Sequence, residues 1–251
     1  MALLRNRRYL VMLLAALLVG GGSAAWLGRD SLRTWYYLRS LERADEASRD
    51  AWAGRVAGLG SAAVPAAVSR LANPEPQACD NLRAALARLA EPWPAEDPRR
   101  AELGGRLIDG FASFSPAGQR AALRLAADWL KPASADRRPP APAVQLAARL
   151  LTEASRSEDC DVRSAALDLA AALLDGGDWT GLLGPCRDLA RACLRDDRPE
   201  NRTRAVRLAL HPGMDLAEQV FPLLQDPATE VRRAAMLVAG AAQNVISTEK
   251  L

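Results

Sequence analysis

The stretch LAEQVFPLLQDPATEVRRAAMLVAGAA, residues 216–242, carries two helical patterns on either side of a short turn. Apolar residues on each side recur at i, i+3, i+4 and i+7, the spacing of one face of an amphipathic helix. The turn is Gln225-Asp226-Pro227, and Pro227 suits the start of the second helix, because its missing N–H would be unpaired there. The stretch therefore predicts a pair of helices joined by a turn.

The same outline, a polar or proline-containing turn followed by an Ala/Leu helix, recurs upstream at a spacing of roughly 30 to 45 residues. A period of this size is typical of supersecondary units stacked one on the next. Joints rich in proline and glycine divide the units. We therefore expect about five helix pairs, over residues 61–90, 98–130, 139–174, 182–210 and 215–242.

The composition favours the same fold class. Of the 251 residues 49% are hydrophobic, yet only 5% are aromatic, and roughly a fifth are alanine. Alanine is the best helix former and buries little area, so a core of this kind comes from closely packed helices. Sheets draw on β-branched and aromatic residues, and the sequence therefore predicts an all-α protein.

One segment carries a resemblance to a known family. Residues 226–235, DPATEVRRAA, resemble the inter-helix turn and second helix of a HEAT repeat, and residues 159–166 are a second match. The likeness covers roughly residues 60–251 and is to HEAT-repeat proteins, among them bacterial membrane-anchored ones. It implies an armadillo-like, right-handed α-solenoid of about five helix pairs, in which Asp226 and Arg232 help cross-link neighbouring units. The first two units depart from this pattern, since they lack the Val-Arg pair and a clear turn aspartate.

An uncharged segment near the N-terminus predicts a membrane span. Residues 9–27 would form a helix of about 28 Å, nearly the thickness of a hydrocarbon core. Three arginines precede the segment, and Tyr9 and Trp26 lie at its ends, where interfacial aromatics are typical. We therefore expect residues 1–28 to be a single-pass signal anchor. The positive-inside rule then predicts a cytoplasmic N-terminus, with the rest of the chain on the outer side of the cell membrane.

Two other interpretations of this segment stay open. The small residues over 20–25, GGGSAA, also suit signal peptidase, and cleavage there would release a secreted protein. A buried core helix is the third interpretation, although the length and the flanking arginines argue against it.

Residues 29–60 form the second expected domain. The helical spacing from residue 30 to residue 58 predicts a juxtamembrane helix, and a linker follows it. Trp35, Tyr36 and Tyr37 would close one end of the array with an apolar surface.

Residues 61–251 form the third expected domain, the repeat array. A turn is expected at residues 243–244, and a new helix capped by Ser247 after it. Solenoids usually finish with a polar capping unit, and none follows the fifth pair. The array is therefore either incomplete at the C-terminus or covered there by another molecule.

The charge pattern argues against nucleic-acid binding. Of the 33 basic residues, Arg5, Arg7 and Arg8 precede residue 29, and the remaining 30 balance the 30 acidic residues. Residues 29–251 therefore carry no net charge and lack the broad positive field that phosphate binding normally requires. We therefore expect a protein partner, and contact with the membrane through residues 9–27, and no nucleic acid.

Residues that would carry catalysis or hold a metal are scarce. The single histidine, His211, lies in a His-Pro-Gly turn, so a histidine-based triad is not expected. The four cysteines form no CxxC pair, which argues against zinc and iron–sulfur sites. We expect no catalytic residue, no cofactor and no metal.

Two enzyme classes resemble HEAT-like arrays: some bilin lyases, and certain alkylpurine DNA glycosylases in which Trp, Asp and Arg line a groove. Residues of these types are Trp93, Trp129 and Trp179, with Asp97, Asp128 and Asp178 nearby. A neutral, exported body argues against a DNA enzyme, and the tryptophans are better interpreted as filling gaps between alanine-rich helices.

The sequence thus predicts a membrane-anchored or exported HEAT-repeat scaffold for protein–protein interaction, without enzymatic activity. The residues expected in the repeat ladder or in contact with a partner are Arg163, Arg207, Asp226 and Arg232. A bilin-lyase-like enzyme on the same scaffold and an accessory domain of a longer protein stay as alternatives.

Overall fold

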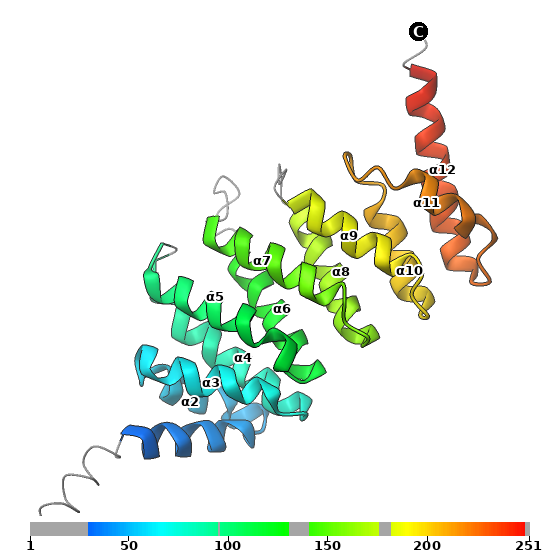
Figure 1. The fold of residues 1–251 in the computed structure, drawn as a ribbon. Helices are drawn as coiled ribbons and strands as arrows, with labels where there is room; N and C mark the ends of the chain where they lie inside the picture. The colour runs from blue at the N-terminus through cyan, green and yellow to red at the C-terminus, as the bar shows by residue number, and fades with distance from the viewer. Residues whose placement is uncertain (1–29, 95, 131–140, 176–181, 249–251) are drawn as a thin grey trace, which may run out of the picture.

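The computed structural model describes residues 30–94, 96–130, 141–175 and 182–248 (Figure 1). Within these ranges the chain forms α-helices, 3₁₀ turns and loops, and no strand. The all-α class predicted from the alanine-rich composition is therefore confirmed for this part of the chain.

The first described helix covers residues 30–42. The elements that follow it are α2 (Glu46–Ala57), η1 (Gly60–Ala63), α3 (Val64–Ser69), η2 (Arg70–Ala72), α4 (Pro76–Ala90), α5 (Pro98–Gly110), η3 (Phe111–Ser113), α6 (Pro116–Leu130), α7 (Ala141–Ala154), α8 (Cys160–Asp175), α9 (Leu183–Cys193), α10 (Pro199–Leu208), α11 (Ala217–Val220), η5 (Phe221–Gln225) and α12 (Thr229–Thr248).

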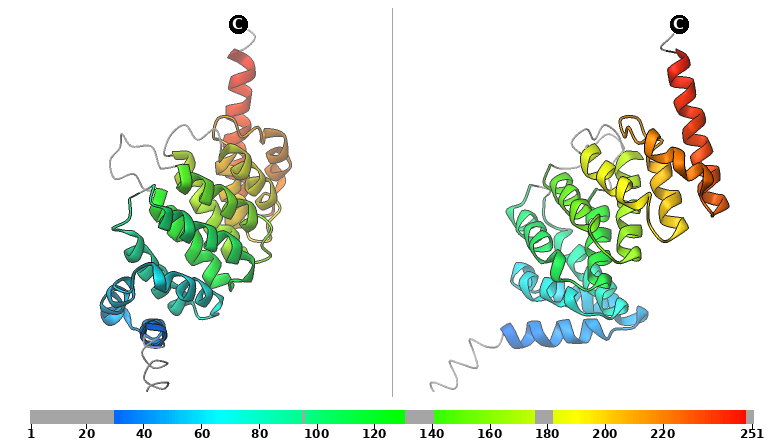
Figure 2. Two further views of the ribbon diagram at one scale, coloured as in Figure 1. Left: turned by 60° about the vertical axis from the view of Figure 1, so that its left-hand side comes forward. Right: turned by 45° about the vertical axis from the view of Figure 1, so that its right-hand side comes forward.

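The helices lie in two rows. Helices α2, α4, α6, α8, α10 and α12 contact one another in that order, and we call them the even row; α3, α5, α7 and α9 form a second series of contacts, the odd row. The chain alternates between the rows, so each helix packs against helices close to it in sequence, an arrangement compatible with an α-solenoid. The helix over residues 30–42 and α12 lie at opposite ends, and the second half of α12 extends beyond the helices it packs on (Figures 1 and 2).

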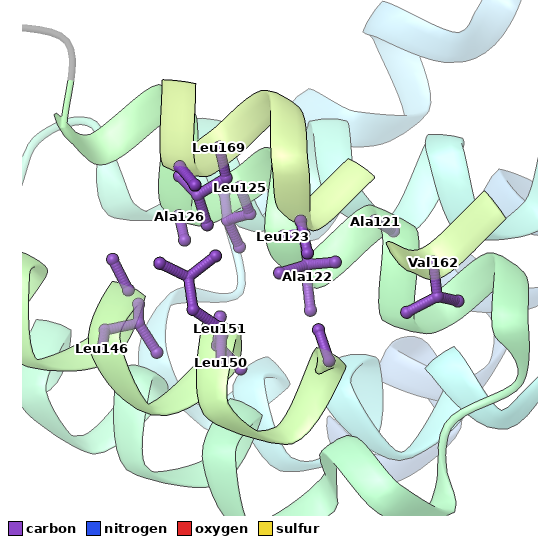
Figure 3. Packing of buried hydrophobic residues seen from close by; sticks show 14 of the residues in the cluster. Ala121, Ala122, Leu123, Leu125, Ala126, Leu146, Leu150, Leu151, Val162 and Leu169 are labelled. Carbon is purple, nitrogen blue, oxygen red and sulfur yellow. The ribbon is translucent and has the colours of Figure 1, made fainter. Parts of the chain in front are cut away.

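The core between the rows consists mainly of leucine and alanine. Figure 3 shows leucines of α6, α7 and α8 pointing toward one another, among them Leu125, Leu150 and Leu169, which are buried. Alanines such as Ala122 and Ala126 lie between them and let the helices approach closely. Burying one such leucine stabilises the fold by about 1.5–3 kcal/mol, so the helices are held mainly by this contact surface.

The expected single helix over residues 30–58 is two helices in the structure. The first ends at residue 42, the chain turns, and α2 begins at Glu46. The side chain of Asp45 caps α2 by accepting a hydrogen bond from the backbone N–H of Ser48 at 2.9 Å. Because α2 then packs along α4, this segment adds a helix to the even row.

The last unit also differs from expectation at two points. The turn expected at residues 243–244 is wrong, because α12 continues to Thr248; no proline interrupts it there. The first helix of this unit is short, since α11 ends at Val220 and a 3₁₀ turn containing Pro222 replaces its continuation. Pro222 has no N–H with which to extend the α-helical hydrogen bonds.

The predicted membrane span over residues 9–27 lies outside the described residues. Among the helices that the structure does describe, none combines the length and the apolar character needed to cross a bilayer.

Candidate functional site: the ladder and charged face of the even row

The turns before α8, α10 and α12 share one arrangement, in which a polar residue of the turn is followed six positions later by an arginine. Each turn contains a polar residue, and the arginine six positions later lies in the first turns of the following helix. Nη1 of each arginine donates to the backbone carbonyl of its polar residue, at 2.6, 2.7 and 2.8 Å in chain order. The three pairs are Ser157 with Arg163, Asp196 with Arg202, and Asp226 with Arg232.

The same arginines reach forward to the next turn. Nε of Arg163 donates to Oδ2 of Asp196 at 2.6 Å. Nε and Nη2 of Arg202 donate to the two carboxylate oxygens of Asp226, at 2.8 and 2.9 Å. The Asp196 side chain is fully buried and that of Asp226 nearly so. Charge-assisted hydrogen bonds of this kind therefore join α8 to α10 and α10 to α12; we call the series the ladder.

The ladder places the predicted residues as follows. Asp226 does link neighbouring units, but its partner is Arg202, which the sequence reasoning did not single out. Arg232 instead donates to the backbone carbonyls of Asp226 and Pro227, within its own turn. The signal that would have found Arg202 is the repeated six-residue spacing between the turn residue and the arginine, which also picks out Arg163.

The upstream units use neutral groups where the ladder has charges. The position six residues after Asn73 is Cys79, whose Sγ lies 3.1 Å from the Asn73 carbonyl oxygen. Ser115 Oγ donates to the same carbonyl at 2.6 Å, and the fully buried Asn81 donates to carbonyls of the turn before α2. Neutral hydrogen bonds thus stand in these units where the ladder has ion pairs.

The carboxylates of the ladder have lowered pKa values. Hydrogen bonds from Arg202 are the main cause for Asp226, and burial opposes them. Burial is the largest single influence on Asp196 and would raise its pKa, but hydrogen bonds from Arg163, the Arg198 backbone and other donors outweigh it together. Both aspartates are thus held in the charged form by the groups around them.

We expect the ladder to lose its stabilising effect in acid. An Asp in the unfolded chain has a pKa of about 3.9, and the pKa values of Asp196 and Asp226 in the folded protein lie below it. At a pH between the folded and unfolded values, the unfolded state binds more protons, so the free energy of unfolding decreases as the pH is lowered. The effect is fully present above about pH 5 and is lost as the pH falls through the folded pKa values. Asp226→Asn should therefore lower the free energy of unfolding at pH 7 and weaken its acid dependence in urea titrations. If the free energy of unfolding depended on pH in the same way in the variant and the wild type, the acid dependence would not come from the ladder.

Further ion pairs connect the exposed surface of consecutive even-row helices; we call this surface the charged face. Its pairs are Arg124 with Asp80, Arg83 with Asp128, Arg120 with Asp161, Arg198 with Asp161, and Arg204 with Asp168. Because each arginine meets a carboxylate of the neighbouring unit, the face has alternating charges and no broad positive field.

Two hollows open on the charged face. One of about 400 Å³ lies between α6 and α8, and one of about 350 Å³ lies between α8 and α10; Asp168 lines both. Arg207 lines the second hollow and is exposed, and no side chain of the described ranges pairs with it. On the charged face, Arg207 is therefore the predicted residue whose charge is open to a partner.

The Trp and Asp residues that resemble a glycosylase groove have structural roles where the structure describes them. Trp93 is buried, and the Arg99 guanidinium lies over its ring, 5.1 Å from the ring centre. Asp97 accepts hydrogen bonds from the backbone and the side chain of the same arginine and caps α5. Asp128 pairs with Arg83 at 2.7 Å. Asp178 and Trp179 lie outside the described residues.

A separate hollow of about 280 Å³ lies between α5, α6 and α7. Its lining is mainly apolar and includes Ile108, Trp129 and Leu146; the charged side chains Arg100, Asp109 and Arg149 line it as well. Arg100 lies 5.7 Å from the Trp129 ring centre and donates to the Ala90 carbonyl, and these contacts fix the position of its guanidinium.

Comparisons with protein-family models, curated proteins and solved structures gave no match. The functional argument therefore rests on the residues themselves.

Burial raises the pKa values of Cys186 and Cys193 to about 12, which keeps both thiols protonated and unreactive near neutral pH. His211 Nδ1 lies 2.9 Å from the Pro212 carbonyl oxygen. Within the described ranges no group of three or more His, Cys, Asp or Glu side chains is arranged to hold a metal ion.

Proposed function

We propose that this chain is a HEAT-like, right-handed α-solenoid that acts as a scaffold for another protein. The observation that carries the proposal is the charged face, a surface that runs along consecutive units held together by the ladder. Stacked helix pairs of this kind present extended binding surfaces, and alternating charges select a partner with the complementary pattern. Arg207 and the adjoining hollows supply the open part of the surface.

A binding role fits the chemistry of the hollows better than an enzymatic one. The two hollows of the charged face are lined by arginines, carboxylates, leucines and alanines. Ser164 lines the first hollow and His211 the second, so within the described residues no serine and histidine share one hollow. We assign no catalytic residue, cofactor or metal to the scaffold.

The scaffold is proposed to be held at the cell membrane by residues 9–27, with its helices on the outer side. The support is the uncharged segment and the arginines before it. Intact mass, membrane fractionation and protease treatment of intact cells test this together. A full-length membrane protein digested only from outside is expected; loss of about 25 residues would indicate a cleaved signal, and a full-length soluble cytoplasmic protein would contradict export.

The binding role is tested by site-specific crosslinking in cells. A photo-reactive residue in place of Arg207 should capture a defined partner, while one in place of Arg106, an exposed arginine of the odd row, should not. The partner's affinity should fall at least about tenfold in Arg207→Glu and stay unchanged in Arg106→Glu. Equal effects of the two substitutions would contradict a partner site on the charged face.

A further inference from the structure

Arg232 makes only one of the two kinds of hydrogen bond that the other ladder arginines make. Like Arg163 and Arg202, it donates to the carbonyl of its own turn. The other two arginines also hold the aspartate of the following turn, whereas no carboxylate within the described residues reaches the Arg232 guanidinium. Its position therefore offers a site for one more aspartate-bearing turn.

The same end of the molecule exposes large apolar side chains. Met236 and Leu237 on α12 are 58% and 66% exposed, and Arg233 lies exposed near them. Apart from Leu210, the exposed large hydrophobic residues of the described chain lie at its two ends; those at the first end are Leu32, Trp35 and Tyr36. Exposed apolar residues that gather in this way mark an interaction surface.

The opposite end of the even row has matching features. The turn before α2 ends in the exposed Asp45, whose Oδ1 accepts from Ser48 and whose Oδ2 has no partner in the described chain. Ala47 and Ala51 are exposed one helical turn apart on α2. Large side chains pack well onto such a small-residue surface.

The turn before α2 is also already part of the line of contacts between units. On its inner side Asn81 of α4 donates to the carbonyls of Leu41 and Ala44, both at 2.9 Å. The segment over residues 30–57 is thus a helix pair whose turn lies where the ladder turns lie, with its aspartate facing outward.

We infer that a second copy of this chain docks on the α12 face, head to tail, with Asp45 of one copy accepting hydrogen bonds from Arg232 of the other. Ala47 and Ala51 of the incoming α2 cover Met236 and Leu237. The two surfaces differ, so the contact is heterologous and adds copies in a row. This association does not depend on the proposed scaffold function, because it uses the exposed faces of α2 and α12 and leaves the charged face free.

The test is sedimentation velocity of the full chain in a mild detergent, from about 1 to about 100 µM. The wild type should form species that grow by whole copies as the concentration rises. Arg232→Asp and Asp45→Arg should each weaken association at least about tenfold, and a mixture of the two should restore it, because the mixed contact again joins opposite charges. Arg106→Asp is the matched control and should change nothing.

A second variant guards against damage to the fold, since Asp45 also caps α2. Leu237→Asp touches no cap and should abolish growth while the circular dichroism spectrum stays that of the wild type. The inference is overturned if the wild type stays a single copy at all concentrations, if association survives Arg232→Asp and Leu237→Asp, or if mixing the charge variants restores nothing. A different protein found on the α12 face in place of a second copy would overturn it as well.

Discussion

Gly118→Ala is expected to lower the free energy of unfolding by about 3 kcal/mol or more. A Cβ atom on Gly118 would lie 1.9 Å from the carbonyl oxygen of Leu71 and 2.8 Å from its carbonyl carbon. These are backbone atoms of η2, and the backbone N–H of Ser115 donates to the same carbonyl oxygen at 3.2 Å, so neither side can give way without breaking the contact between α6 and η2. At other positions inside a helix, a Gly→Ala substitution raises the free energy of unfolding by up to about 1 kcal/mol. At Gly118 the close approach of η2 makes the same substitution destabilising.

Gly105→Ala is the matched control. Gly105 also lies inside a helix, α5, and a Cβ there would meet nothing within 4 Å. This variant should be stabilised by up to about 1 kcal/mol. Urea unfolding followed by circular dichroism measures both, and a Gly118→Ala protein as stable as the wild type would contradict the close approach of α6 to η2.

Asp196→Ala is expected to lower the free energy of unfolding by about 3–5 kcal/mol. The carboxylate is fully buried and accepts from Arg163, from Asn201 and from the Arg198 backbone. Its removal leaves the positive charge of Arg163 without a charge partner, and water cannot replace that partner well, because the Arg163 side chain is only 14% exposed.

Asp188→Ala separates this effect from the loss of an ordinary surface pair. Asp188 pairs with Arg191 along the exposed side of α9. Such pairs contribute less than about 1 kcal/mol, so the variant should unfold close to the wild type. If Asp196→Ala and Asp188→Ala unfolded at the same urea concentration, the ladder would have no special role in stability.

Much of the fold is predictable from local pattern. The expected second pair, residues 98–130, matches the limits of α5 and α6, because apolar spacing and flanking prolines act within a few residues of each other. The break at residues 43–45 and the continuation of α12 past residue 244 were missed. In the first case Asp45 caps a new helix inside a continuous pattern, and in the second no breaker residue is present where the turn was expected.

The candidate site is less predictable, because it depends on contacts between units. Asp226 was identified from the turn it occupies, but its partner Arg202 lies 24 positions earlier on another helix. Arg163 and Arg207 look alike in sequence, yet one is enclosed in the ladder and the other is exposed. Gly118 likewise resembles any helical glycine until η2 is packed against it.

A double-mutant cycle on Arg202 and Asp226 tests most directly whether neighbouring units are joined by the ladder. The free energies of unfolding of Arg202→Ala, Asp226→Ala and the double variant give the coupling energy, and Arg106 with Glu102, an exposed pair within α5, gives the reference. We predict a coupling of about 1.5 kcal/mol or more for the ladder pair and about 0.5 kcal/mol or less for the reference. A ladder coupling no larger than the reference would contradict the account.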